Sequence, residues 1–266
     1  MADAHATVRT ALVTGASGGI GLELARLLAA DGYRLALVAR DPAKLERAAQ
    51  ELSARATHPA TAVTQDLAAP DAAARVVEAL DAEGLTIDVL VNNAGYAVYG
   101  AFAETAPDAE LAMLQVNVVA LTALTKRLLP GMVAHGHGRI LNLASTAAFL
   151  PGPLMTSYYA SKAYVLSFTE GLAEELRGSG VTITALCPGP TETGFQQRAA
   201  MEESRIFKLT RMRDAAQVAK AGYEGMLAGK TVVVPSWSDR LTTMAPRLMP
   251  RALVPRLVKR AQEPDR

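Results

Sequence analysis

Residues whose types and spacing could support acid–base chemistry lie in one short segment, Thr156–Val165, which reads TSYYASKAYV. Residues four apart on a helix share a face, so Tyr158 and Lys162 are neighbours if this segment is helical. An unperturbed tyrosine has a pKa of about 10, and a nearby ammonium lowers that pKa by favouring the phenolate. The pair is therefore a candidate general acid or base, and the alternative is ordinary decoration of a surface helix.

Ser145 is the third residue of this candidate site. It ends the apolar run Gly138–Ser145 (GRILNLAS), which predicts a strand. Open parallel sheets bind ligands at the carboxyl ends of their strands, and a hydroxyl at that edge can donate a hydrogen bond to a substrate carbonyl oxygen. Ser145, Tyr158 and Lys162 thus form a possible catalytic set, provided that the fold brings them together.

The elements that must position this set alternate along the chain, with short apolar runs separated by helical stretches. Seven runs predict strands: Thr10–Gly15, Arg34–Arg40, Ala60–Asp66, Ile87–Gly95, Gly138–Ser145, Val181–Gly189 and Thr231–Ser236. Runs without polar alternation are buried on both faces, as in parallel sheets joined by right-handed helical crossovers. The sequence therefore predicts an α/β fold with a doubly wound, parallel, seven-stranded sheet of Rossmann type.

A glycine-rich turn, Thr14–Gly21 (TGASGGIG), follows the first predicted strand. Glycine permits positive φ and lets a pyrophosphate approach the backbone and the helix N-terminus. The spacing differs from G-x-G-x-x-G, so a tight turn without a ligand is the alternative. Because first strands of such sheets lie at the switch point where dinucleotides bind, we interpret the turn as a dinucleotide site.

The end of the second predicted strand bears on the choice of cofactor. An NAD site usually has an acidic residue there, which bonds the adenosine ribose 2′-hydroxyl. This chain instead has Ala39 and Arg40, and a guanidinium suits a 2′-phosphate, so the sequence favours NADP over NAD. The alternatives are a solvated Arg40 and a ribose contact from Asp41, which we interpret as the cap of a helix beginning at Pro42.

Taken together, these motifs resemble the short-chain dehydrogenase/reductase family over about residues 8–236. The matching motifs are TGASGGIG, NNAG at Asn92–Gly95, Asn117 in QVNVV, Ser145 upstream of YYASK, and PGPTET at Pro188–Thr193. The resemblance implies an oxidoreductase that transfers a hydride between NADP(H) and a carbonyl compound or secondary alcohol. It also implies a homodimer or homotetramer that assembles through the helices around Asn117 and Tyr158.

The same resemblance implies roles for individual residues. Tyr158, and not Tyr159, is implied as the acid/base because only Tyr158 has a lysine four residues later; Tyr159 is then a packing residue or a pocket wall. Lys162 is implied to lower the tyrosine pKa and hold the nicotinamide ribose, Ser145 to polarise the carbonyl, and Asn117 to hold a water that relays protons. The implied catalytic residues are Asn117, Ser145, Tyr158 and Lys162.

Further residues are implied as cofactor contacts. They are Gly15, Ser17, Gly18, Gly19, Ile20, Gly21, Arg40, Asp66, Leu67, Asn93, Ala94, Gly95, Tyr158, Lys162, Pro188, Gly189, Thr191 and Thr193. Within this set Asp66 is implied to bond the adenine amino group, and Asn93–Gly95 to line the adenine-side ribose. Pro188, Gly189 and Thr193 are implied to lie near the nicotinamide and its carboxamide.

Two segments, Thr146–Met155 and Thr193–Phe207, are implied to wall the substrate site. Their apolar residues are Phe149, Leu150, Leu154, Met155, Phe195, Met201, Ile206 and Phe207, with Tyr96 and Tyr99 as additional candidates. These residues predict an apolar pocket for a hydrophobic ketone or aldehyde. The alternative is that each one is a core or interface residue.

Composition limits the other classes of function. The chain has 266 residues, of which 50% are hydrophobic, and a net charge of +1, so no strong field favours nucleic acid as a partner. The single cysteine, Cys187, excludes an internal disulfide and favours a core role in a cytoplasmic protein. The start lacks a signal-peptide pattern, and no run of about 18 apolar residues predicts a membrane span. His135 and His137 are interpreted as turn residues, with no metal site.

The chain is divided into a dinucleotide-binding domain, residues 1–238, and a basic C-terminal extension, residues 239–266. Prolines divide the extension into short helical pieces. It is interpreted as a segment that touches anionic lipid, as a tail that packs on a neighbouring subunit or covers the substrate opening, or as a surface-packed extension. Alternatives for the whole protein are a non-catalytic dinucleotide sensor and a membrane-recruited scaffold; the complete Ser145–Tyr158–Lys162 set argues against the sensor.

Overall fold

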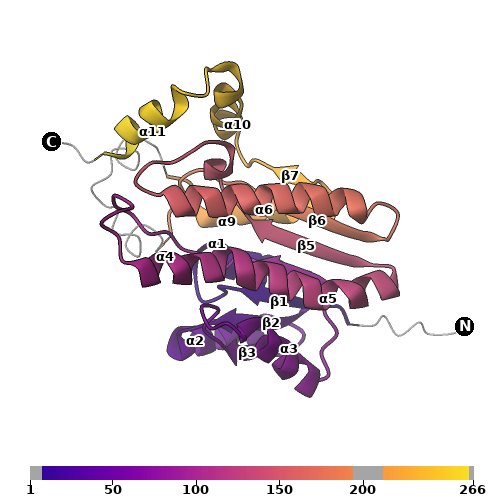
Figure 1. Cartoon of the computed structure of the whole chain (residues 1–266). Coiled ribbons are helices and arrows are strands. Elements are labelled where there is room, and N and C mark those ends of the chain that lie inside the picture. Colours follow the sequence, from indigo (N-terminus) through magenta and orange to yellow (C-terminus); the bar gives the residue numbers. More distant parts are fainter. Residues whose placement is uncertain (1–7, 194–211, 264–266) are drawn as a thin grey trace, which may run out of the picture.

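The structure is a computed structural model that describes residues 8–193 and 212–263. Its strands form one parallel sheet in the order β3-β2-β1-β4-β5-β6-β7. Figure 1 shows this sheet with β3 at one edge and β7 at the other. The strands are β1 (Thr10–Thr14), β2 (Arg34–Ala39), β3 (Thr61–Thr64), β4 (Val89–Asn92), β5 (Gly138–Leu143), β6 (Val181–Leu186) and β7 (Val232–Val233). The predicted doubly wound, seven-stranded sheet is confirmed.

The central strands are buried on both faces, as their unbroken apolar runs predict. Every residue of β1 and β4 is buried, whereas the edge strand β3 alternates between half-buried and exposed positions. The other edge strand, β7, is shorter than the predicted Thr231–Ser236, and Pro235, which has no N–H to donate to a ladder, follows closely. The strand order reverses between β1 and β4, and this switch point is where such sheets bind ligands.

Helices cover both faces of the sheet and complete a three-layer architecture. One face carries α1 (Gly19–Ala30), α2 (Pro42–Ser53) and α9 (Ala215–Leu227), whose buried residues join one core cluster. The other carries α3 (Ala72–Ala82), α5 (Leu121–His135) and α6 (Thr156–Glu175), whose apolar residues join a second cluster. Both faces of the sheet are thus covered by helices, and the carboxyl ends of its strands remain accessible for a binding site.

The longest helical stretch, Pro107–His135, runs through α4 (Pro107–Leu114), a π-helical turn (Gln115–Ala120) and α5 without interruption. By length and composition it is long and apolar enough to cross a membrane, whereas the sequence analysis found no run of residues that predicts a membrane span. A core helix passes the same test, and here Leu124 and Met132 pack in the cluster beneath the sheet. The π-helical turn contains Asn117; such turns are frequent at functional sites.

The C-terminal extension folds back toward the catalytic edge. It consists of α10 (Trp237–Met244), a 3₁₀ turn (Ala245–Leu248) and α11 (Val254–Gln262), drawn in yellow in Figure 1. Val258 packs against the cluster that contains Tyr158 and Tyr159. The predicted start of the extension, residue 239, lies inside α10.

Candidate active site

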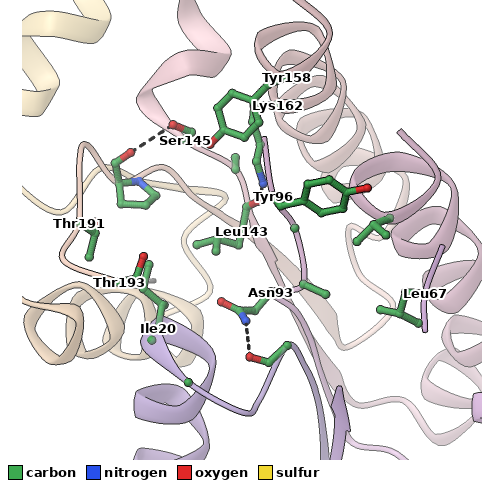
Figure 2. Close-up of a pocket in the computed structure, with 18 of the residues that line it drawn as sticks. Ile20, Leu67, Asn93, Tyr96, Leu143, Ser145, Tyr158, Lys162, Thr191 and Thr193 are labelled. Atoms are coloured by element: carbon green, nitrogen blue, oxygen red, sulfur yellow. Dashed lines mark hydrogen bonds between the residues drawn. The ribbon is translucent and has the colours of Figure 1, made fainter. Parts of the chain in front are cut away.

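A cavity of about 560 Å³ opens at the carboxyl edge of the sheet (Figure 2). Its walls come from the turns after β1, β2, β3, β4, β5 and β6, from the start of α6 and from the end of α11. All predicted catalytic and cofactor residues line this cavity except Gly21 and Asn117. The structure therefore brings together residues that are up to about 180 positions apart, from Gly15 to Thr193.

Tyr158 and Lys162 lie one turn apart on α6, as their spacing predicts. Both side chains are buried and both line the cavity. The Nζ of Lys162 donates a hydrogen bond to the backbone oxygen of Leu143 (2.6 Å) and lies 5.8 Å from the centre of the Tyr158 ring. The ammonium is therefore held between the end of β5 and the tyrosine.

The pKa of Tyr158 lies above its ordinary value, opposite to the shift predicted from the helical spacing. Burial of the phenol raises this pKa, and the hydrogen bond with the Ser145 side chain lowers it only in part. The prediction was wrong in sign because desolvation of the phenolate outweighs the favourable contacts. Burial also lowers the pKa of Lys162 to about 8. Tyr158 thus keeps its proton at neutral pH, which is the form that a proton donor needs.

Ser145 is fixed at the end of β5 by the start of a short 3₁₀ helix, Thr146–Phe149. Its Oγ accepts from the N–H of Ala147 (3.1 Å) and donates to the backbone oxygen of Pro188 (3.4 Å), the contact dashed in Figure 2. These bonds join the ends of β5 and β6 and hold Oγ within hydrogen-bond distance of the Tyr158 side chain. Ser145 is thus held where a substrate oxygen can meet both hydroxyls.

Asn117 is a structural clamp in this site. Its Oδ1 accepts from the N–H of Tyr96 (3.1 Å), while its Nδ2 donates to the backbone oxygen of Tyr96 (2.9 Å) and to Oγ of Ser161 (3.1 Å). The side chain therefore ties the loop after β4 to α6 and does not line the cavity. Its predicted water-holding role stays a prediction, because the contacts of the side chain are to protein groups.

Gly95 allows the side chains of Asn117 and Lys162 to lie close to the loop after β4. A Cβ at this position would lie 3.0 Å from Oδ1 of Asn117 and 3.5 Å from Nζ of Lys162. A side chain here would require Asn117 to shift by a few tenths of an ångström, whereas its contact with Lys162 would be an ordinary van der Waals contact, so the glycine lets the loop pass close to the amide of Asn117.

The glycine turn is fixed by hydrogen bonds from the Asn93 side chain. Its Nδ2 donates to the backbone oxygens of Thr14 (2.9 Å) and Gly15 (3.2 Å). A Cβ on Gly21 would lie 2.3 Å from this nitrogen, so Gly21 serves close packing and does not face the cavity. Gly18, by contrast, has no atom within 4 Å of a Cβ and lies against open space. The predicted cofactor turn is thus closely packed at Gly21 and open to the cavity at Gly18.

Two cations line the far end of the cavity. Arg40 is exposed and forms no salt bridge with the described residues, which leaves its guanidinium available to a ligand. Lys44, which the sequence analysis did not name, lines the same end. Oδ1 of Asp41 accepts from the N–H of Lys44 (3.0 Å), so its interpretation as a helix cap is confirmed. That hydrogen bond lowers the pKa of Asp41.

Tyr96 lies toward the same end, on the side of Leu67 in Figure 2. Burial raises the pKa of Tyr96, and the charges of Arg40 and Asp66 also act on it. Tyr96 lines the cavity and also packs against the cluster that contains Tyr158 and Tyr159, so its predicted place in the substrate wall stays a prediction. The side chain of Asp66 accepts from the N–H of Ala68 (3.0 Å), which fixes its carboxylate at the rim.

A partly buried ion pair supports the segment after β6. Nε of Arg213 lies 2.8 Å from Oδ2 of Asp239, and a Cβ on Gly189 would lie 2.7 Å from Oδ1 of the same carboxylate. Thr191 forms an isolated parallel bridge with Arg213 and donates from Oγ1 to the oxygen of Gly189 (2.9 Å). No local pattern predicts this pair, because its members lie 26 positions apart and in different elements.

The substrate end differs from its prediction in several residues. Met155 lines the cavity as predicted, together with Ala147 and Tyr159. Phe149, Leu150, Leu154 and Tyr99 do not line it, whereas Phe195, Met201, Ile206 and Phe207 lie outside the described residues.

Gln262 of the extension is the functional candidate that the sequence analysis missed. It lines the cavity, its Nε2 donates to Oη of Tyr159 (2.6 Å), and its backbone oxygen accepts from Oη of Tyr99 (2.7 Å). No local pattern in the sequence points to this residue, because its partners are more than 100 positions away.

Two other groups lie outside the site chemistry. The rings of His135 and His137 stack with centres 6.0 Å apart at the turn before β5, and His137 lies 3.4 Å from a carboxylate oxygen of Asp88. Among residues 8–193 and 212–263, no group of three metal-ligating side chains occurs. Cys187 is buried, and burial raises the pKa of its thiol to about 12, as suits a core residue.

Comparison with known proteins decides the family. Residues 9–204 match the family model described as "short chain dehydrogenase". Dehydrogenase/reductase SDR family member 7B of Bos taurus is 34% identical over 96% of this chain and 84% of its own length. This chain belongs to the short-chain dehydrogenase/reductase family.

Solved structures of short-chain dehydrogenases agree with this assignment. A short-chain dehydrogenase from Sphingobium yanoikuyae, solved in complex with NADPH, has a TM-score of 0.81 and 31% identity, with 97% of this chain and 99% of that chain covered. The bulky-bulky ketone specific alcohol dehydrogenase from Comamonas testosteroni has a TM-score of 0.76 and 29% identity, with coverage of 91% and 92%. As a family member the protein is an NAD(P)-dependent oxidoreductase.

The cavity of this short-chain dehydrogenase/reductase fits a nicotinamide dinucleotide. The glycine turn exposes backbone beside Gly18 at the N-terminus of α1, as a pyrophosphate requires. Cations lie at the β2 end, and the hydroxyls of Ser145 and Tyr158 lie at the β5 end. The two chemical ends of the cavity therefore match the two ends of the cofactor.

Proposed function

We propose that this protein is an NADP-dependent carbonyl reductase or alcohol dehydrogenase that acts on an apolar ketone, aldehyde or secondary alcohol. The observation that carries the proposal is the hydrogen bond between the Ser145 and Tyr158 side chains in a cavity that Lys162 also lines. Two hydroxyls joined in this way form a site for one substrate oxygen.

A bound nicotinamide would supply the hydride for reduction or accept it in oxidation. The residues of this chain handle the oxygen and its proton. Ser145 donates a hydrogen bond that polarises the carbonyl, and Tyr158 delivers its phenolic proton to the oxygen as negative charge develops there. Lys162 keeps a positive charge beside the tyrosine and stabilises the phenolate that remains.

NADP is favoured over NAD because the adenosine end of the cavity carries Arg40 and Lys44. The one acidic group close to Arg40 in sequence, Asp41, is engaged as the cap of α2. A free guanidinium with a neighbouring ammonium suits a 2′-phosphate better than a ribose hydroxyl. The Sphingobium relative, whose structure holds NADPH, is consistent with this choice.

An apolar substrate is supported by the cavity wall near Tyr158. Met155, Ala147 and the Tyr159 ring line that end, and of the residues that the structure describes, Lys162 is the one charged residue that lines it next to Ser145. The Comamonas relative is named for bulky ketones. These observations support a hydrophobic carbonyl compound over a phosphorylated one.

The deciding experiment is a screen of NADPH oxidation against ketones and aldehydes, with NADH in parallel. Tyr158→Phe should lower kcat by a factor on the order of 10²–10⁴ and leave the Kd for NADPH unchanged. Tyr159→Phe, the matched control, removes a hydroxyl from the neighbouring position and should retain turnover. Wild-type turnover by Tyr158→Phe would contradict the assignment, and binding of NADPH without turnover of any carbonyl would favour a dinucleotide sensor.

We further propose a cytoplasmic homodimer or homotetramer that assembles through α5, α6 and the π-helical turn. Val119 and Tyr164 are exposed there, and Tyr164 stacks on Phe168 with ring centres 5.8 Å apart. A second copy that covers this face would bury its apolar side chains. Sedimentation equilibrium tests the assembly: Val119→Glu should yield monomers, and a monomeric wild-type protein would contradict it.

A further inference from the structure

Among the described residues of the C-terminal extension, Gln262 is the one that lines the active-site cavity. It ends α11, and its side chain is fully buried at 0% exposure. It lines the same cavity as Tyr158, although the two residues lie 104 positions apart (262 − 158). Glutamine side chains are mostly exposed in folded proteins, so complete burial of this one indicates a specific role.

One end of the Gln262 amide has a partner and the other has none. Nε2 donates to Oη of Tyr159 (2.6 Å), whereas Oε1 is shielded from water and has no hydrogen-bond partner among the described residues. A buried polar atom without a partner costs about 1–3 kcal/mol. Such atoms are rare in native proteins, and a ligand that supplies the missing bond is one reason for which they persist.

The position of the amide is fixed by the packing of α11. Val254, Val258 and Gln262 follow one another at intervals of four, so they share a face of the helix. Val254 is buried, and Val258 packs on the cluster that holds Tyr159. The hydrogen bond from Tyr99 to the backbone oxygen of Gln262 ties the last turn down. The amide is therefore presented to the cavity by a docked helix.

Among the described residues that line the cavity, Gln262 is the one whose side chain has a buried polar atom without a hydrogen-bond partner, the acceptor Oε1. A substrate group that donates a hydrogen bond would satisfy it. An analogue that replaces the donor by a methyl group would leave the oxygen unpaired. Sites built to bond a hydroxyl reject analogues that lack it much more strongly than apolar pockets reject an extra methylene.

We infer that Gln262 is a specificity-determining residue, which selects carbonyl substrates that carry a hydroxyl group on the part of the molecule remote from the reacting carbonyl. The inference rests on the proposed function and names its substrate class: hydroxyl-bearing, otherwise apolar ketones. Tyr159 acts as a positioning residue, because its hydroxyl holds the other end of the amide.

The test uses the full chain with NADPH and matched pairs of aryl ketones, the 2-, 3- and 4-hydroxyacetophenones and the corresponding methylacetophenones. The readout is the ratio of kcat/KM for the hydroxyl and methyl members of each pair. Gln262→Met removes the acceptor at similar volume and should lower this ratio about tenfold for at least one position. The intrinsic reactivities of the ketones cancel when the ratio is compared between proteins.

Arg260→Met is the matched control, since it places the same residue on the exposed side of the same helix. It should leave the ratio unchanged. Hydrogen exchange over Val254–Gln262 reports whether α11 stays docked in the Gln262 variant. If it does not, Tyr159→Phe replaces that variant: it releases the amide while the apolar contacts of α11 remain, and the ratio should fall in the same way.

Two results would overturn the inference while leaving the proposed function intact. One is turnover of the methyl ketones by the wild-type protein without a preference for a hydroxyl at any position. The other is a preference that persists in Gln262→Met with α11 docked, or in Tyr159→Phe. Absence of turnover with every ketone and aldehyde would instead count against the proposed function itself.

Discussion

The Nζ of Lys162 donates a hydrogen bond of 2.6 Å to the backbone oxygen of Leu143, at the end of the strand that leads to Ser145. This contact places the ammonium inside the protein, where burial lowers its pKa to about 8. The same burial raises the pKa of Tyr158. The two groups are therefore both shifted toward their neutral forms, and the lysine is the one that titrates near physiological pH.

The first prediction concerns the pH dependence of carbonyl reduction. As pH rises through about 8, Lys162 loses its charge while Tyr158 keeps its proton, so kcat/KM should fall above about pH 8. Lys162→Arg carries a guanidinium that does not titrate, so its residual activity should lose this alkaline limb. The measurement is kcat/KM against pH with NADPH saturating. An identical limb in both proteins would assign the titration to another group.

The second prediction concerns the choice between cofactors. Arg40→Asp removes the cation that faces the adenosine end and adds a repulsive charge, so the KM for NADPH should rise by about tenfold to a hundredfold while that for NADH changes little. Arg47→Asp makes the same charge change on the exposed side of α2, away from the cavity, and should leave the cofactor ratio unaltered. Equal effects of the two variants would point to the general field of the protein and not to a phosphate contact.

The third prediction separates packing from ligand contact in the glycine turn. Gly21→Ala forces a Cβ to within 2.3 Å of Nδ2 of Asn93 and should lower the free energy of unfolding by about 1–3 kcal/mol. Gly18→Ala meets open space and should change it by less than about 0.5 kcal/mol. Urea unfolding without cofactor measures both. Equal destabilisation by the two variants would mean that the backbone of the turn shifts to accommodate a Cβ at Gly21, and that close packing against Asn93 does not limit this position.

The fourth prediction tests the lipid interpretation of the extension. Trp237, Leu241 and Met244 share a face of α10 and are 75%, 56% and 58% exposed. With the basic residues of the extension nearby, this face should bind vesicles that contain phosphatidylserine, and not pure phosphatidylcholine vesicles. Co-sedimentation should be lost in Trp237→Ser and in the chain that ends at Ser238. If the wild-type protein stays in the supernatant with both vesicle types, the lipid interpretation is wrong.

Local patterns in the sequence were sufficient for the seven strands, the glycine turn and the proximity of Tyr158 to Lys162. Apolar runs without alternation indicate buried parallel strands whatever the partner. The cap at Asp41 depends on Pro42 and the helix that follows, and the pairing of Tyr158 with Lys162 depends on one helical turn. Each of these features depends on residues only a few positions apart, so it can be predicted from the local sequence.

The tertiary structure alone decided what lies between distant segments. It showed that Asn117 binds Tyr96 and Ser161, and that Arg213 pairs with Asp239. It also reversed the expected pKa shift of Tyr158, because desolvation depends on every group that covers the phenol and not on the nearest cation in sequence.

The extension illustrates the same limit most clearly. Its sequence left open whether it meets lipid, another subunit or the substrate opening, since an amphipathic helix has an apolar face for any of these. Only the fold places Gln262 against Tyr159, because a contact between residues 103 positions apart is set by how helices pack on the sheet and leaves no periodic trace in the chain.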